Sequence, residues 1–259
     1  MSNSALIKSS LAKKYWMALT GLFLCLFLIG HLVGNLQLFL PGYAGKLQFN
    51  EYAVFMTSNP AVKILSYLVY FSIIFHAVDG LMLTIQNRKA RPQKYAYSKP
   101  SANTIWSSRN MGILGTLVLA FIVFHMQDFW YEYKFDAMPY MTTEDGSGLL
   151  LKSGEAVYNG TVNESFEIVS ETGQVMGPVM KDLHEEVMEA FEEWWIVVLY
   201  LVGLIAISFH LWHGFESAFT SLGLKTPKVE STIKKLGYAF AVLVPLAFAV
   251  IPIYIYLMH

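Results

Sequence analysis

The stretch WWIVVLYLVGLIAISFHLWHGFESAFT, residues 194–220, decides the fold class of this chain. It is longer than the ~20 residues that a helix needs to cross a bilayer, and it is almost free of charge. Such a stretch predicts a transmembrane helix. Two histidines, His210 and His213, lie inside it. Imidazoles at membrane depth are costly, so the stretch also raises the question of what they do there.

The composition of the whole chain agrees with a membrane protein. Of its 259 residues, 55% are hydrophobic and 14% are charged, whereas soluble domains carry about 25% charged residues. The formal net charge of −1 gives no bulk attraction to nucleic acid. The single cysteine, Cys25, excludes a disulfide framework, a zinc cluster, an iron–sulfur site held by this chain alone and covalent attachment of haem.

Five apolar stretches are long enough to span a bilayer. They cover residues 16–40, 61–85, 111–130, 194–220 and 236–257. Tryptophan and tyrosine gather near their ends, as they do at the two interfaces of a bilayer. The sequence therefore predicts an all-α membrane protein, with one transmembrane domain over residues 1–259 and a bundle made of the first four helices.

Basic residues predict the orientation of these helices. They gather before the first span (Lys8, Lys13, Lys14), in the second connection (Arg88, Lys89, Arg91, Lys94, Lys99, Arg109) and in the fourth (Lys225, Lys228, Lys234, Lys235). These positions hold 13 of the 18 basic residues. Because basic connections stay in the cytoplasm, the N-terminus is expected inside and the C-terminus outside.

The third connection, residues 131–193, is acidic and lies on the outer side in this orientation. It holds 14 of the 19 acidic residues and three lysines. Near its end, Leu183, Val187 and Phe191 repeat every four residues. This spacing predicts an amphipathic helix on the outer surface.

Histidines in four different spans carry the functional signal. His31, His76, His125 and His210 lie 15, 15, 14 and 16 residues into their spans. Any one of them alone is readily a neutral core histidine hydrogen-bonded to a neighbouring helix. Four spans that each hold one at a similar depth fit that interpretation poorly, and ionisable groups inside a membrane mark functional sites.

The direction of each span sorts these histidines into two levels. His31 and His125 lie in the outer half of the membrane, because their spans run outward. His76 and His210 lie in the inner half, because their spans run inward. Two facing imidazoles at one level suit the two axial positions of a haem iron. The pattern predicts a four-helix bundle around two stacked b haems, without an open position for oxygen, and hence electron transfer.

Local sequence selects His210 rather than His213 as the inner ligand. The segments FHAVDG (75–80) and FHLWHG (209–214) share the form F-H-x-x-x-G, in which a glycine one turn from the histidine leaves room for a flat macrocycle. Asp79 and His213 lie one turn further inward. Two interpretations stay open for them. They face each other below the inner haem, bonded to each other or to its propionates, or each extends toward the cytoplasmic interface.

Four segments together resemble one family. They are KKYWMALTGLFLCLFLIGHLVGN (13–35), IIFHAVDG (73–80), FIVFHMQDF (121–129) and FHLWHGFESAFTSLGL (209–224) with TPK (226–228) after it. They resemble the membrane cytochrome b subunit of succinate dehydrogenase and fumarate reductase. The similarity is to the single-chain, five-helix, two-haem type of menaquinone-using bacteria. It covers the chain nearly end to end, except for residues 131–193.

The resemblance implies a membrane anchor and electron-transfer subunit of respiratory complex II, or of a quinol:fumarate reductase, in the bacterial inner membrane. His76 and His210 would bind the haem proximal to the cytoplasm, and His31 and His125 the distal one. The implied partners are a flavoprotein subunit, which carries the dicarboxylate chemistry, and an iron–sulfur subunit that docks on the basic cytoplasmic connections. Menaquinone is the implied substrate, and a higher oligomer of the complex is compatible with it.

The resemblance also points to proton-handling groups. In such relatives a glutamate after the first span assists menaquinone near the distal haem, and Glu51 stands closest to that place. Asp128 is its rival, one turn beyond His125. The plain alternative is that Glu51 is a solvated loop charge and Asp128 a charge at a helix end. Some relatives carry a proton-moving glutamate two residues before the fourth-helix ligand, where this chain has Ser208.

Two other functions remain open on the sequence. One is a haem b subunit of another quinone-linked dehydrogenase, such as a formate dehydrogenase or a hydrogenase. The other is a proton-conducting transporter that uses the histidines and acids as a relay.

Overall fold

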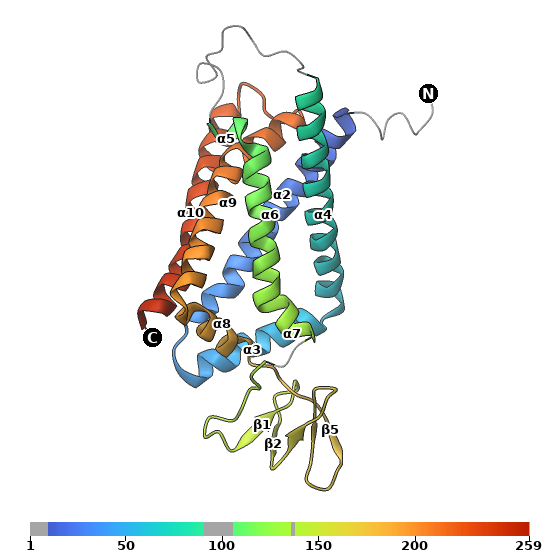
Figure 1. The fold of residues 1–259 in the computed structure, drawn as a ribbon, viewed down its shortest axis with the longest axis vertical. Coiled ribbons are helices and arrows are strands. Elements are labelled where there is room, and N and C mark those ends of the chain that lie inside the picture. Colours follow the sequence, from blue (N-terminus) through green and yellow to red (C-terminus); the bar gives the residue numbers. More distant parts are fainter. Residues whose placement is uncertain (1–9, 91–105, 136–137, 259) are drawn as a thin grey trace, which may run out of the picture. The chain divides into compact units, whose positions relative to one another are not determined.

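The computed structural model describes residues 10–90, 106–135 and 138–258. Figure 1 shows its elements along the chain. They are α2 (Ser10–Asn35), η1 (Leu36–Phe39), α3 (Gly42–Ser58), α4 (Pro60–Lys89), α5 (Trp106–Arg109), α6 (Met111–His125), the π-helix η3 (Met126–Tyr131), α7 (Glu132–Phe135), β1 (Gly148–Leu150), β2 (Ala156–Tyr158), β3 (Thr161–Val162), β4 (Glu167–Val169), β5 (Val175–Pro178), α8 (Leu183–Glu192), α9 (Trp194–Ser221) and α10 (Glu230–Met258).

The predicted membrane spans are confirmed as long apolar helices. Within the described residues, five helical stretches are long and apolar enough to cross a bilayer: Leu11–Phe39, Pro60–Lys89, Met111–Phe135, Trp194–Ser221 and Glu230–Met258. At most 28% of the residues in the most apolar window of each stretch are buried inside the chain. So much exposed apolar surface would be unfavourable in water, and it suits helices that face lipid. The chain is a multi-pass membrane protein.

Local sequence explains where these helices begin and end. The side chain of Asn59 accepts hydrogen bonds from the backbone N–H groups of Ala61 and Val62, and Pro60 occupies the first position of α4. At the end of α9, Gly223 has a φ of +71°. Its N–H bonds to the carbonyl of Thr220, and the N–H of Leu224 bonds to that of Phe219, at 3.1 and 2.9 Å. This pair of bonds is a Schellman motif, which ends a helix.

The chain divides into two compact units that alternate along the sequence. The first holds Met1–Leu32, Ser66–Ile122 and Val198–Val250, and the second holds Val33–Leu65, Val123–Val197 and Ile251–His259. Small residues bring helices of the first unit together. A Cβ on Gly203 of α9 would overlap the ring of Phe121 of α6. Cys25, Leu211 and Ala241, from α2, α9 and α10, form a buried cluster.

The second unit contains structure that the sequence pattern did not predict. In an otherwise helical chain, β1 pairs with β2, and β3, β4 and β5 form a three-stranded antiparallel sheet. A core of Leu151, Val157, Ile168 and Val179 holds these strands. The all-α prediction is wrong for this connection, because its strands of two to four residues are too short to show an alternating pattern.

The first connection contains a helix, α3, that the sequence analysis did not predict. In α3 the buried residues are Gly45, Phe49, Asn50 and Ala53, which recur at helical spacing and form one face. A Cβ on Gly45 would overlap the backbone of Leu40, so the turn before α3 requires glycine. The amphipathic helix predicted at the end of the acidic connection is confirmed as α8, with Val187 and Phe191 buried.

A buried polar cluster joins α3 to the start of α8. Asp182 caps α8 by accepting a hydrogen bond from the backbone N–H of Glu185, at 3.1 Å. The same carboxylate accepts a bond from the Asn50 side chain at 2.7 Å and pairs with Lys46 at 2.7 Å. Asn50 and Asp182 are 0% and 3% exposed. Burial alone lowers the pKa of Lys46, but its hydrogen bonds to Asp182 and Glu185 outweigh this effect and raise it.

Four of the basic residues that predict the orientation lie outside the described residues. They are Lys8, Arg91, Lys94 and Lys99. The other basic residues of the same connections lie within the described part of the chain. Lys13, Lys89 and Arg109 lie at helix ends, and Lys225 and Lys228 lie in the turn between α9 and α10.

We expect Asp182→Ala to destabilise the second unit by about 2–4 kcal/mol, because it removes a helix cap and leaves Lys46 and Asn50 without their common partner. Limited proteolysis of residues 138–182 in the purified protein measures this effect. Asp145→Ala is the control, because Asp145 is exposed and bonds only within its own turn, to Thr143 and Ser147. Equal cleavage of the two variants would contradict the role assigned to the cluster.

Candidate functional site

Two of the predicted histidines face each other in the first unit. His76 of α4 and His210 of α9 have ring centroids 6.0 Å apart and ring planes at 65°. A bond from a metal to an imidazole nitrogen is about 2 Å long, so two imidazoles on opposite sides of one iron have centroids roughly 6 Å apart. The pairing of these two histidines, which was predicted from their depth alone, is therefore present with a spacing that fits one iron.

Hydrogen bonds define which nitrogen of His76 is available. Its Nδ1 lies 3.2 Å from the carbonyl oxygen of Met17 and 3.3 Å from the hydroxyl of Thr20. A carbonyl oxygen only accepts, so Nδ1 carries the proton and donates it toward α2. The lone pair is then on Nε2. Histidines that bind metals are held in the same way, by a carbonyl that receives the proton of the other nitrogen.

Thr20 is a candidate site residue that the sequence analysis missed. Its side chain is buried, at 6% exposure. The hydroxyl donates to the carbonyl of Trp16 at 2.8 Å, which leaves its lone pairs directed at His76. A threonine that bonds one turn back along its own helix is ordinary in apolar segments. Its second bond, to another helix, has no signal in the sequence.

His210 differs from His76 in the surroundings of its Nδ1. Among the side chains that the structure describes, its Nδ1 is buried without a hydrogen-bond partner. A buried polar atom of this kind costs about 1–3 kcal/mol. Iron held at Nε2, the nitrogen that the orientation of His76 leaves available, would not give this Nδ1 a partner. The fit of the pair to a metal-centred group therefore depends on the 6.0 Å spacing and on the orientation of His76.

Glycines leave room beside both rings. A Cβ on Gly21 of α2 would lie 3.1 Å from Cε1 of His76, and one on Gly115 of α6 would lie 3.6 Å from Cε1 of His210. The glycines of the predicted F-H-x-x-x-G form, Gly80 and Gly214, would meet nothing closer than 4.0 Å. All four positions are therefore compatible with a flat group beside the pair.

Asp79 and His213 do not pair directly. Both are half-buried, and no hydrogen bond or ion pair joins them in the described part of the chain. The first form of their predicted role, a bond between the two side chains, is absent. Contact of either with haem propionates stays a prediction.

Ser208 stands where some relatives carry a proton-moving glutamate. Its hydroxyl donates to the backbone carbonyl of Ala241 in α10 at 2.6 Å. Ala241 is fully buried. Ser208 therefore joins α9 to α10, and its only proton is engaged in that bond.

The outer histidines lie in different units, and each is described within its own. His31 of α2 stacks on Phe27 with centroids 5.4 Å apart and contacts Phe248 at 5.6 Å. His125 ends α6 and lies edge-on to Phe129 at 5.5 Å. The π-helix η3 begins directly after it. Single turns of π-helix occur frequently at functional sites, and this one was not predicted.

The two carboxylates proposed for proton handling both lie in the second unit. Glu51 is exposed on α3, and its Oε1 would lie 3.9 Å from a Cβ on Gly154. Asp128 is half-buried in η3. Burial, together with the charges of Glu132, Glu189 and Asp128, raises the pKa of Glu186. Asp128 thus belongs to a group of carboxylates, whereas Glu51 faces the loop that carries Gly154.

Comparisons with protein-family models, with curated proteins and with solved structures give no match. The described residues also contain no group of three or more histidine, cysteine or acidic side chains that could hold a metal ion. A haem iron needs only two such ligands from the protein, because the macrocycle supplies the other four.

We expect Thr20→Val to weaken haem retention at the His76 site by about 10–100-fold, the effect typical of lost hydrogen bonds behind metal ligands. Thr20→Ser is the matched control, because it keeps the hydroxyl and should retain haem. The measurement is haem retained per chain during titration with a competing haem-binding protein. Equal retention by the two variants would show that the Met17 carbonyl alone orients His76.

Proposed function

We propose that this chain is the membrane anchor and two-haem electron-transfer subunit of a succinate:quinone oxidoreductase or a quinol:fumarate reductase. The observation that supports it most directly is the His76–His210 pair, with its 6.0 Å spacing and with His76 oriented by Met17 and Thr20. The four histidine-containing segments that resemble the family provide the second support.

In this proposal His76 and His210 hold the inner haem, and His31 and His125 hold the outer one. A bound haem supplies one-electron oxidation and reduction of its iron. The chain itself would hold each haem through two imidazoles, and it orients one of them, His76, through Met17 and Thr20. Glycines at positions 21 and 115 leave space for the rings of His76 and His210.

The proposed setting is the bacterial inner membrane, with the N-terminus in the cytoplasm and the C-terminus outside. The positive-inside rule supports this orientation. An iron–sulfur subunit docks on the basic second and fourth connections, and a flavoprotein subunit carries out the dicarboxylate chemistry. Residues 131–193 then lie outside the cell membrane, on the side of the outer haem.

We place menaquinone chemistry at the outer end. Quinone reduction consumes two electrons and two protons, so the site needs a carboxylate or imidazole with access to water. Glu51 meets this requirement because it is exposed on α3. Asp128 is the rival, since it follows His125 within η3 and shares its surroundings with Glu132 and Glu186.

The purified protein should contain two b haems per chain. His210→Leu should lose one of them, because it removes an axial ligand, whereas His213→Leu should keep both. Pyridine haemochrome quantitation measures the haem content. A content of one haem or none in the unmodified chain would refute the pairing of the histidines by depth. Loss of haem in the His213 variant alone would show that His213, rather than His210, is the inner ligand. Absence of haem would favour the transporter function.

Glu51→Gln should abolish quinone-coupled turnover while both haems stay bound and succinate oxidation with an artificial acceptor continues. The reason is that the amide cannot deliver a proton. Turnover with a menaquinone analogue, measured in the purified complex, tests this. Full activity in Glu51→Gln together with loss in Asp128→Asn would transfer the role to Asp128. The co-purifying subunits identify the dehydrogenase and separate complex II from a formate dehydrogenase or a hydrogenase.

A further inference from the structure

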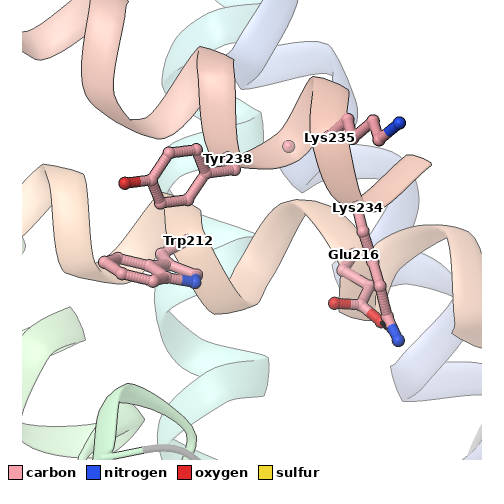
Figure 2. A pocket seen from close by; sticks show the side chains of 6 residues that line it. Trp212, Glu216, Lys234, Lys235 and Tyr238 are labelled. Carbon is pink, nitrogen blue, oxygen red and sulfur yellow. Dashed lines mark ion pairs between the residues drawn. The ribbon is translucent and has the colours of Figure 1, made fainter. Parts of the chain in front are cut away.

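A groove of about 480 Å³ lies between α9 and α10 in the first unit. Figure 2 shows its lining, which is formed by Trp212, Glu216, Lys234, Lys235, Gly237 and Tyr238. The rings of Trp212 and Tyr238 meet edge to face, with centroids 5.1 Å apart and planes at 84°. The groove therefore combines an aromatic wall with charged side chains at one end.

The groove does not belong to the histidine site. Residues of an α-helix are separated by about 100° around its axis, so Trp212 points roughly 200° away from His210. Glu216 lies one turn beyond Trp212, on the same face. A molecule in the groove would consequently lie against the side of α9 that is turned away from the His76–His210 pair. A quinone there would have α9 between itself and the inner site.

The acidic groups beside the groove are already compensated. Glu216 pairs with Lys225 at 2.6 Å and with Lys234 at 3.9 Å, and Glu230 pairs with the same two lysines at 3.1 and 2.8 Å. Two carboxylates and two ammonium groups thus form a neutral network. Lys235 is exposed and takes no part in it. In Figure 2 it extends away from the Glu216–Lys234 pair. Among the described residues, the groove therefore carries one positive charge without an acidic partner.

These features match the requirements of one ligand class. Tryptophan and tyrosine beside lysine are typical of the level of the lipid headgroups, and basic pockets between transmembrane helices on the cytoplasmic side bind anionic headgroups. An apolar wall that continues along two exposed helices accommodates an acyl chain. We propose that the α9–α10 groove binds an anionic phospholipid. Its phosphate lies at Lys235, and the part of an acyl chain next to the headgroup lies against Trp212 and Tyr238.

This inference does not depend on haem binding. It assigns the groove to lipid rather than to a soluble subunit, because the aromatic wall lies along the sides of membrane-spanning helices. A protein partner would instead meet the lysines of the connection itself. Lys228 is such a residue, since it is exposed in the turn between α9 and α10 and does not line the groove.

The test uses the full chain in detergent and native mass spectrometry, with phosphatidylglycerol and phosphatidylcholine of equal chain length as probes. We expect about a fivefold preference for phosphatidylglycerol, the contribution of one lysine at a membrane surface. Lys235→Gln should lose this preference, and the matched control Lys228→Gln should keep it. Tyr238→Ala should weaken binding of both lipids, because it shortens the aromatic wall. Circular dichroism verifies that each variant is folded.

Equal binding of the two lipids by the unmodified chain would overturn the proposal. So would an equal loss of preference in the Lys235 and Lys228 variants, which would indicate a diffuse attraction rather than a site. If Lys235→Gln kept the lipid preference but lost the soluble subunits during purification, the groove would be a protein-docking surface instead.

Discussion

The absence of water inside a bilayer is the constraint on which the rest of this structure depends. Polar groups in a span must find partners within the protein. Hydroxyl groups do so here by donating to backbone carbonyls, as Thr84 does to Gly80, Thr116 to Gly112 and Ser208 to Ala241. Against this background Nδ1 of His210 is an exception, since it is buried without a hydrogen-bond partner among the described residues. The same constraint explains why His76 donates its proton to a carbonyl of α2.

The second requirement of a helical membrane protein is that its helices approach one another closely, which small residues permit. In this chain some glycines receive phenylalanine rings and others receive imidazoles. Gly203 and Gly237 receive the rings of Phe121 and Phe215, so they serve the packing of helices. Gly21 and Gly115 receive imidazoles instead. A Cβ at Gly21 would press on the ring of His76, whereas one at Gly115 would only touch the ring of His210. Glycine at a helix contact therefore supports the fold at positions 203 and 237 and the candidate site at positions 21 and 115.

Segments with a long apolar run or a clear periodicity were predicted correctly from the sequence. Segments with a weak pattern were not. Long apolar runs and the spacing of Val187 and Phe191 appear as helices, because burial of one face or exposure to lipid dominates their energetics. The helix α3 was missed because only four of its residues are buried. The strands were missed because their order depends on contacts such as the bridge between Leu151 and Val179, which join residues far apart in the sequence. No local pattern encodes such contacts.

The same distinction applies within the site. Depth along the spans was enough to pair His76 with His210, because a helix converts residue number into height. The position of a residue along a helix does not determine how the helix is rotated about its own axis. For α9, this rotation decides whether His210 or His213 faces a partner helix. His210 is in ring contact with His76, and the carbonyl and hydroxyl that orient His76 come from α2. A helix outside the pair thus sets the tautomer of one member, so the arrangement of these two histidines depends on three helices.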